Sequence, residues 1–345
     1  MSIEMVSLKY RNTFALPVNV EHLALVDKIE LMLQVWQQTQ KYQMPLLVLG
    51  EGSNVLFLED FAGTVMLNQF KGIDIREDVN TWHLHISSGE NWHDLVCYTL
   101  QAGIAGLENL ALIPGLVGGA AVQNIGAYGI ELQNVCEYVD LLELFTGAIN
   151  RIPVADCGFG YRESIFKHAF QNGYIILALG LCLSKKWRPM LEYEAFSHLD
   201  SATVTPTQIF NFVCAKRKMN LPDPRKIGNA GSFFKNPLVS EKKYESLISQ
   251  YPRMPHYPQL CGKFKLAAGW LIDQCELKGY RLGGAAVHGQ QALVLVNADN
   301  ATGQEIVALA RHVRNTVASK FDVWLEPEVR FIGVMGELNG VEVLS

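Results

Sequence analysis

The chain of 345 residues has few charged side chains and a mildly negative net charge. Charged residues make up 18% of it and hydrophobic ones 49%, a balance typical of a folded protein and not of a largely disordered one. The net charge of −5 argues against a surface that binds nucleic acid. An anionic ligand must therefore be held by a few placed arginines, lysines and backbone amides.

Closely spaced cysteines and long apolar runs are also absent. Disulfide frameworks and zinc sites need grouped cysteines, so we expect reduced, mostly buried thiols at positions 97, 136, 157, 182, 214, 261 and 275. The longest uncharged apolar run, 174–183, is about half of the ~20 residues that a membrane helix needs. The N-terminus has charges where a signal peptide has its apolar core. These features predict a soluble, cytoplasmic protein without membrane insertion.

Glycine, by contrast, is concentrated in one stretch. Residues 106–132 contain six glycines and only two charged side chains, Glu108 and Glu131. Glycines between apolar neighbours leave the backbone uncovered, so that its amides can approach a large ligand closely. This stretch predicts a cofactor-binding protein before any catalytic residue is considered.

The hydrophobic periodicity predicts a mixed α+β chain. Leu25, Ile29, Met32 and Trp36 recur at helical spacing, so we expect an amphipathic helix over 21–42. Short alternating runs predict strands at 64–67, 82–86, 139–145, 174–183, 292–297 and 328–334. A second helix is indicated by the shared face of Ile306, Leu309, Val313 and Val317. Proline, glycine and charge together in 216–231 mark a domain boundary near 217–228.

The first glycine loop, residues 50–54, follows an apolar strand and invites a dinucleotide-binding interpretation. A Rossmann loop needs a third glycine three residues after the second, followed by a helix. That position is Val55, and another strand-like run follows it. The loop is therefore strand–turn–strand, and its amides with the Ser53 hydroxyl could form a nest around a pyrophosphate. The alternative is a plain β-turn.

The second glycine region, 113–129, adds hydrogen-bonding side chains at Gln123, Asn124 and Tyr128. Its glycines could alternatively serve the close packing of strands or helices. Two glycine loops about 60 residues apart suit an extended cofactor such as FAD, held along its pyrophosphate and its flavin.

Three short motifs carry side chains that could do chemistry: YRES at 161–164, NAGSFFKNP at 229–237 and LEPEVRF at 325–331. Each has a structural alternative. Arg162 could pair with Glu163 or with a neighbouring strand, and Ser232 could cap a turn. The alternating charges of the third motif, Glu326, Glu328 and Arg330, could form an ion-pair ladder on one strand face. Ser232 lacks the G-x-S-x-G elbow of a nucleophile. No histidine pair has metal-binding helical spacing; His83 and His85 share one side of a strand, and we expect no metal there.

Seven segments resemble motifs of one protein family and follow one another in the same order as in that family. They extend over nearly the whole chain, from about residue 10 to 333: LGEGSNVLF, IPGLVGGAAVQNIGAYG, YRESIFK, NAGSFFKNP, KLAAGWLIDQC, GAAVH and LEPEVRFIG. On these segments the chain resembles UDP-N-acetylenolpyruvoylglucosamine reductase (UDP-N-acetylmuramate dehydrogenase), in the longer variant with a mobile tyrosine loop. The resemblance implies a vanillyl-alcohol-oxidase/PCMH-type FAD-binding fold in two subdomains, plus a C-terminal α+β substrate-binding domain. It also implies bound FAD, NADPH as co-substrate, and hydride transfer to an enolpyruvyl sugar nucleotide in peptidoglycan precursor synthesis.

The resemblance also implies roles for particular residues. Ser232 is the expected proton donor, while Arg162 and Glu328 hold the substrate carboxylate and stabilise developing negative charge. We expect these three catalytic side chains to converge over the flavin. Residues assigned to cofactor binding are Gly50, Gly52, Ser53, Asn54, Gly115, Gly118, Gly119, Asn124, Gly126, Arg217 and Arg330. Residues assigned to substrate binding are Tyr128, Tyr193 on the mobile loop, Lys235, Asn236, Tyr257 and Gln291. Asn220 departs from the family pattern, where a lysine is expected, so Lys218 or Lys235 must supply the charge.

The expected domains are an FAD-binding subdomain of residues 1–70 plus 328–345, a second of residues 71–216, and a substrate-binding domain of residues 217–327. The PCMH-type FAD-binding region as a whole is expected at about 13–184. We expect a monomer whose partners are small molecules.

Two other functions are also compatible with these sequence features. One is a flavoenzyme of the same fold that oxidises an alcohol or sugar with oxygen as acceptor. The other is a flavin- or nucleotide-binding regulatory protein that has lost catalysis. Arg162 together with a serine acid favours reduction of an enol ether, and the presence of all three catalytic residues argues against a regulatory protein.

Overall fold

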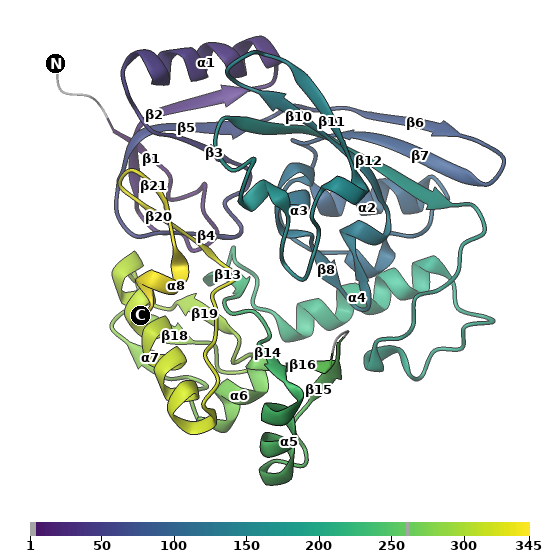
Figure 1. The fold of residues 1–345 in the computed structure, drawn as a ribbon, viewed down its shortest axis with the longest axis vertical. Coiled ribbons are helices and arrows are strands. Elements are labelled where there is room, and N and C mark those ends of the chain that lie inside the picture. The colour runs from purple at the N-terminus through teal and green to yellow at the C-terminus, as the bar shows by residue number, and fades with distance from the viewer. Residues whose placement is uncertain (1–4, 260–261) are drawn as a thin grey trace. The chain divides into compact units, whose positions relative to one another are not determined.

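The computed structural model describes residues 5–259 and 262–345 (Figure 1). The chain divides into two compact units. Unit 1 comprises Met1–Glu21, Gly52–Ala62 and Asn220–Ser345, and unit 2 comprises His22–Glu51 and Gly63–Met219. Cys261, one of the thiols that we expect to be reduced, lies outside the described residues. The expected three-way domain division stays a prediction.

Unit 2 is built on a five-stranded antiparallel sheet, with strand order β11-β10-β12-β7-β6. Its strands are β6 (Ile73–Glu77), β7 (Thr81–Ser87), β10 (Cys136–Glu143), β11 (Ile149–Pro153) and β12 (Tyr174–Ser184). The unit also contains β3 (Leu46–Leu49) parallel to the end of β5 (Phe61–Asn68), and the short hairpin β8 (Gly126–Ala127) and β9 (Ile130–Glu131). The strands predicted at 64–67, 82–86 and 174–183 are confirmed. The one predicted at 139–145 ends at Glu143, before a turn at Gly147, which has φ 74°.

A bulge in this sheet places residues of β12 that are two positions apart on opposite faces. The register between β10 and β12 shifts between Asp140 and Leu141. Because of this shift, Leu179 faces the main apolar core, whereas Leu177, two residues earlier, joins a second core. The main core packs α2 (Trp92–Gln101) and α3 (Val117–Gln123) against the sheet, and the second packs α1 (Ile29–Lys41). In Figure 1 these helices lie on opposite sides of the strands.

Further helical segments of unit 2 connect these elements. The long helix is α4 (Pro206–Asn220), and the 3-10 turns are η1 (Glu108–Leu110), η2 (Leu132–Asn134), η3 (Val154–Asp156), η4 (Ile165–Lys167) and η5 (Glu194–Phe196). Asn91 caps α2, since its side chain accepts the N–H of Asp94 at 2.9 Å.

The helix predicted over 21–42 was wrong at its N-terminal end. Residues Asn19–Val26 form strand β2, and α1 begins only at Ile29. Leu25, which we placed on the helical face, is 52% exposed, while its neighbour Val26 is fully buried. In an eight-residue strand only the alternating inward side chains are buried, so a leucine on the outer face can imitate the start of a helical stripe.

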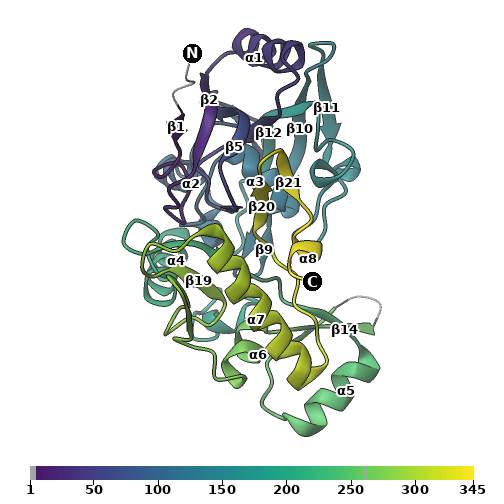
Figure 2. The same cartoon turned by 90° about the vertical axis from the view of Figure 1, so that its left-hand side faces the viewer.

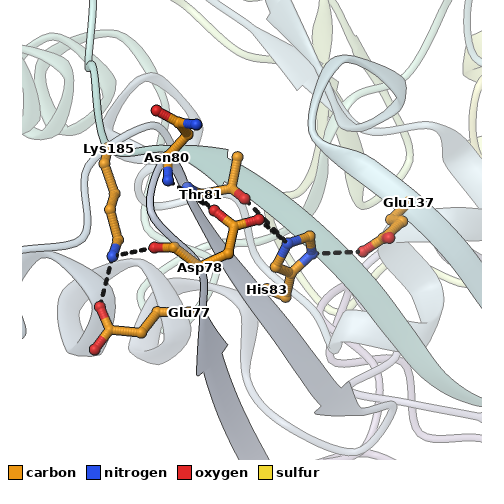
Figure 3. A network of polar contacts seen from close by, with 7 residues as sticks. All are labelled: Glu77, Asp78, Asn80, Thr81, His83, Glu137 and Lys185. Carbon is orange, nitrogen blue, oxygen red and sulfur yellow. Dashed lines mark hydrogen bonds and ion pairs between the residues drawn. The ribbon is translucent and has the colours of Figure 1, made fainter.

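A polar network occupies one surface of the five-stranded sheet in unit 2 (Figure 3). His83 of β7 lies between two carboxylates, with Nδ1 3.2 Å from Glu137 and Nε2 3.4 Å from Asp78. Its Nε2 is also 3.0 Å from the hydroxyl of Thr81. Hydrogen bonds to Glu137, and then to Asp78, raise the pKa of His83 because both stabilise the imidazolium.

Unit 1 contains a four-stranded antiparallel sheet, with order β13-β19-β18-β17. Its strands are β13 (Gly228–Ser232), β17 (Arg281–Leu282), β18 (Ala285–Val287) and β19 (Val294–Asn297). Helix α7 (Gly303–Phe321) packs on this sheet and beside α6 (Ala268–Gln274), as Figure 2 shows. A capping box begins α7: the Thr302 hydroxyl accepts the N–H of Glu305, whose carboxylate accepts the N–H of Thr302. The predicted helix around Ile306–Val317 is confirmed. The strand predicted at 292–297 is confirmed over Val294–Asn297.

Two smaller sheets complete unit 1. One has the order β14-β16-β15, from β14 (Leu238–Ser240), β15 (His256–Pro258) and β16 (Lys263–Leu266), with α5 (Glu241–Gln250) beside it. The other joins β21 (Gly336–Leu338), β20 (Arg330–Gly333) and β4 (Val55–Phe57), and α8 (Gly340–Val343) follows. The remaining strand, β1 (Val6–Ser7), pairs with the start of β2. Among the described residues, no helix is long and apolar enough to span a membrane.

Candidate active site

The first glycine loop has the predicted strand–turn–strand form, with β3 before it and β4 after it. Gly52 has φ 64°, and a Cβ there would lie 2.1 Å from the backbone oxygen of Arg11, so only glycine fits. At the end of the loop, Asn54 donates from Nδ2 to the carbonyl of Glu328 at 3.2 Å, and its own carbonyl accepts the N–H of Arg330 at 3.1 Å. Within unit 1 the loop is thus joined to the segment that carries Glu328.

Glu51, within the first loop, is a residue that sequence reasoning missed. Its carboxylate accepts the side-chain amide of Asn91 at 2.6 Å and the backbone N–H of Gly115 at 3.0 Å. All three residues belong to unit 2. A charged residue between two glycines was the available signal, because a carboxylate can accept from two loop donors at once.

The second glycine region is a short helix at its centre, and our description of it as a loop was wrong there. Residues Val117–Gln123 form α3. The N–H of Gly118 donates to Ser88 at 2.9 Å, and a Cβ on Gly118 would lie 2.9 Å from that of Ser88, so close packing explains this glycine. Gly119 is exposed, and a Cβ there would meet nothing within 4 Å. Gly119 is therefore the position of the helix at which a ligand can approach the backbone.

Asn124 ends α3 in the left-handed conformation, with φ 39°, and is fully buried. Its Nδ2 donates to the carbonyl of Gly160 at 2.8 Å and to the carboxylate of Glu131 at 2.9 Å. Its Oδ1 accepts the N–H of Gln133 at 3.0 Å. The side chain is thus bonded to protein groups on both its amide nitrogen and its oxygen.

Arg162 lies in a tight turn of unit 2 and has a positive φ of 56°. Its Nη2 donates to the carbonyl of Gly126 at 2.9 Å. The neighbouring Glu163 carboxylate instead contacts His168 at 2.9 Å and accepts the N–H of Ser164. The hydrogen bond from Arg162 to Gly126 joins this arginine to the neighbouring strand β8.

Arg217 of α4 provides a second guanidinium in unit 2. Its Nε is buried and has no hydrogen-bond partner among the described residues. Burial lowers the pKa of Arg217, and the positive charge of Arg162 lowers it further, while Tyr128 opposes the shift. A buried, unpartnered N–H close to a second cation is a site that an anionic ligand would satisfy. These residues therefore fit a phosphate or carboxylate group.

Two tyrosines predicted to contact substrate are brought together. The rings of Tyr128 and Tyr193 meet edge to face, with centroids 5.3 Å apart. Tyr193 precedes η5 and is 40% exposed. Burial raises the pKa of both hydroxyls, so both are neutral donors at pH 7.

Ser232 and Glu328 lie on neighbouring backbones of unit 1. Ser232 is the last residue of β13, and the next residue, Phe233, accepts the N–H of Glu328 at 2.8 Å. The N–H of Lys235 donates in the same way to Glu326 at 2.9 Å. The two motifs, about 96 residues apart in the sequence, thus run side by side.

The remaining predicted residues of unit 1 have protein contacts as well. Arg330 pairs with Glu337 of β21 at 2.8 Å (Nε–Oε1). Asn236 accepts the N–H of Ala268 at 2.9 Å, and the N–H of Gln291 donates to His288 at 3.1 Å. The ring centroid of Tyr257 lies 6.0 Å from the ammonium of Lys265.

Over residues 5–259 and 262–345, no group of three His, Cys, Asp or Glu side chains could hold a metal ion. His83 lies between carboxylates, while His85 bonds to the Tyr138 hydroxyl at 2.9 Å.

Comparison with known proteins defines the class. The family model described as "FAD binding domain" matches residues 20–149. The model described as "UDP-N-acetylenolpyruvoylglucosamine reductase, C-terminal domain" matches residues 223–332. The protein is an FAD-dependent oxidoreductase, and the predicted α+β class and FAD-binding domain are confirmed.

Relatives of known name agree over the full length. UDP-N-acetylenolpyruvoylglucosamine reductase of Pectobacterium atrosepticum is 57% identical over 345 residues, covering 100% of both chains. The Escherichia coli K12 enzyme of that name is 57% identical, covering 98% of this chain and 99% of its own. The crystal structure of the Thermus caldophilus reductase matches with a TM-score of 0.67 and 26% identity, over 96% of this chain and 99% of that one. The chain belongs to the UDP-N-acetylenolpyruvoylglucosamine reductase family.

Proposed function

We propose that the protein uses NADPH to reduce the enolpyruvyl group of UDP-N-acetylglucosamine enolpyruvate to UDP-N-acetylmuramate, with Ser232 as proton donor. The observation that carries this proposal is the pairing of the Ser232 and Glu328 segments. It brings a hydroxyl and a carboxylate onto adjacent backbones, as a reaction that must both stabilise and protonate a carbanion requires.

When bound, FAD would supply a hydride for the terminal carbon of the enolpyruvyl group. Negative charge then develops on the carbon next to the substrate carboxylate. The Ser232 hydroxyl donates its proton to that carbon: a hydroxyl is a weak acid, but the acceptor is a strong base held close to it. Ser232 is partly buried at a strand end, which fixes its backbone.

Arg162 binds the substrate carboxylate and the charge that spreads into it. A guanidinium suits this role because it stays charged and binds a carboxylate through two parallel N–H donors. Glu328 assists by orienting a donor or by sharing a proton with the developing enediolate. Loss of one such stabilising group typically costs ~3–4 kcal/mol of activation free energy.

Tyr193 covers the bound substrate in this proposal, and the mobile loop that carries it excludes water from the reaction. Tyr128, Lys235, Asn236, Tyr257 and Gln291 bind the sugar nucleotide. The backbones of the two glycine regions hold the cofactor, together with Arg217 and its unpartnered Nε–H. A cytoplasmic monomer acting on small molecules fits this chemistry.

An anaerobic half-reaction tests the function. Enzyme whose flavin has been photoreduced is mixed with the enolpyruvyl sugar nucleotide, and the absorbance of oxidised flavin is followed. We expect rapid reoxidation with formation of one equivalent of UDP-N-acetylmuramate. No reoxidation by the sugar nucleotide, followed by fast reoxidation when oxygen is admitted, would instead identify an oxidase. A second comparison, of NADPH with NADH as reductant, tests the co-substrate.

A further inference from the structure

The loop that carries Arg162 is held in place by side chains of another segment of unit 2. We define the arginine turn as residues 160–163. Gly160 and Glu163 close this turn by exchanging two backbone hydrogen bonds, at 3.0 and 3.1 Å. Between them Arg162 adopts the left-handed backbone conformation, which is strained for a residue with a side chain. Such a turn persists only where its surroundings fix it.

Asn124 provides that fixation at the first residue of the turn. Its Nδ2 donates at 2.8 Å to the carbonyl of Gly160, two residues before Arg162. The same nitrogen contacts the Glu131 carboxylate at 2.9 Å, and Oδ1 accepts the N–H of Gln133 at 3.0 Å. Because Asn124 is fully buried, no water competes for these bonds.

The segment that follows Asn124 contacts the other end of the same arginine. The carbonyl of Gly126 accepts from Nη2 of Arg162 at 2.9 Å. A Cβ at Gly126 would lie 3.2 Å from Nη1 of that arginine and 2.7 Å from Cγ of Glu131, so the position leaves room only for glycine. Residues 124–126 therefore fix both the backbone and the guanidinium of Arg162.

The backbone at position 124 explains why the side chain itself matters. A φ of 39° is available to glycine and to asparagine. Glycine would satisfy the backbone alone, so the amide is what asparagine adds. We propose that Asn124 is a positioning residue that aims Arg162 at the substrate carboxylate, rather than a direct contact of the cofactor. The inference rests on the proposed role of Arg162.

Two substitutions separate the side chain from the backbone. Asn124→Gly keeps the left-handed conformation and removes all three side-chain bonds. Asn124→Asp keeps the size and the acceptor, but places a carboxylate oxygen against the carbonyl of Gly160 and the carboxylate of Glu131. In both variants we expect normal FAD content and near-normal flavin reduction by NADPH. Reoxidation of the reduced flavin by the enolpyruvyl substrate falls about 10²-fold, as for a misplaced catalytic group.

A double variant tests whether Asn124 acts through Arg162. In the Arg162→Ala background, Asn124→Gly should slow reoxidation by less than a further threefold, since the group that it aims is already gone. Independent effects that multiply in full would overturn the inference. Met32→Ala, in the separate core under α1, is the control for general loosening of unit 2. In Met32→Ala any slowing should be the same for flavin reduction and for flavin reoxidation.

A readout that does not need turnover completes the test. Hydrogen–deuterium exchange at the amides of Gly160 and Glu163 should be faster in Asn124→Gly than in the wild type and in Met32→Ala. Unchanged exchange, loss of FAD relative to the Met32→Ala control, or equal slowing of both half-reactions each overturns the inference. If the wild-type enzyme itself fails to react with the sugar nucleotide, the proposed function fails, while the exchange data still decide whether Asn124 fixes the turn.

Discussion

Replacement of Ser232 by alanine is the most direct test of the proposed chemistry. The backbone at this position pairs with Val294 of β19, and alanine preserves that pairing. Removal of a partly buried hydroxyl should therefore change the free energy of unfolding by less than about 1 kcal/mol. A positioned general acid contributes about 10²–10⁴-fold to a rate, which corresponds to about 2.7–5.5 kcal/mol of activation free energy.

Stopped-flow absorbance divides this effect between the two half-reactions. In Ser232→Ala, flavin reduction by NADPH should proceed at the wild-type rate, because no proton reaches substrate carbon in that step. Reoxidation by the enolpyruvyl substrate should fall by the full 10²–10⁴-fold. When the wild-type reaction is run in D₂O, deuterium should appear at the protonated carbon of the product, because the proton donor exchanges with solvent. Near-normal turnover of the alanine variant would falsify the assignment of Ser232 as proton donor, and equal slowing of both steps would point to a structural defect.

Three further predictions follow from other residues. Glu328→Gln should retain more activity than Glu328→Ala in steady-state assays, since an amide still donates a hydrogen bond; equal loss in both variants would show that the carboxylate itself is required. Gly119→Ala should leave the melting temperature nearly unchanged but weaken FAD binding in a fluorescence titration, whereas Gly118→Ala, whose Cβ would press on Ser88, should lower the melting temperature; unaltered FAD affinity in the first variant would remove Gly119 from the cofactor site. The raised pKa of His83 means that its carboxylate contacts stabilise the fold fully below its unfolded pKa of about 6.5 and lose that effect as pH rises through the higher folded pKa. The difference in melting temperature between wild type and His83→Gln should thus be larger at pH 5.5 than at pH 9, and a constant difference would contradict this reasoning.

Periodicity in the sequence identified the regular elements best where one face is buried. The apolar residues of α7 recur at helical spacing, and they are buried in the structure. The sequence pattern alone was therefore enough to predict this helix. The same criterion failed at β2, where exposed Leu25 continued the stripe of α1 by coincidence. It was also silent on α3, since a run of glycine and alanine has no amphipathic pattern to detect.

The contents of the candidate site could be predicted as residue types, but not as contacts. The motifs around Arg162, Ser232 and Glu328 stood out in the sequence, and the family resemblance implied their roles. The pairing of Ser232's strand with the Glu328 segment was not, because register between distant segments is set by tertiary packing. The inward orientation of Asn124 and the buried Nε of Arg217 likewise depend on neighbours contributed by other parts of the chain.

The double acceptor role of Glu51 has a consequence for engineering. Its carboxylate serves one donor 40 residues further along the chain and another 64 residues further along. Libraries that diversify the segment around Asn91 or the one around Gly115 separately will therefore sample coupled positions as though they were independent. A library directed at this part of unit 2 should therefore vary the three positions jointly, because one carboxylate serves both donors.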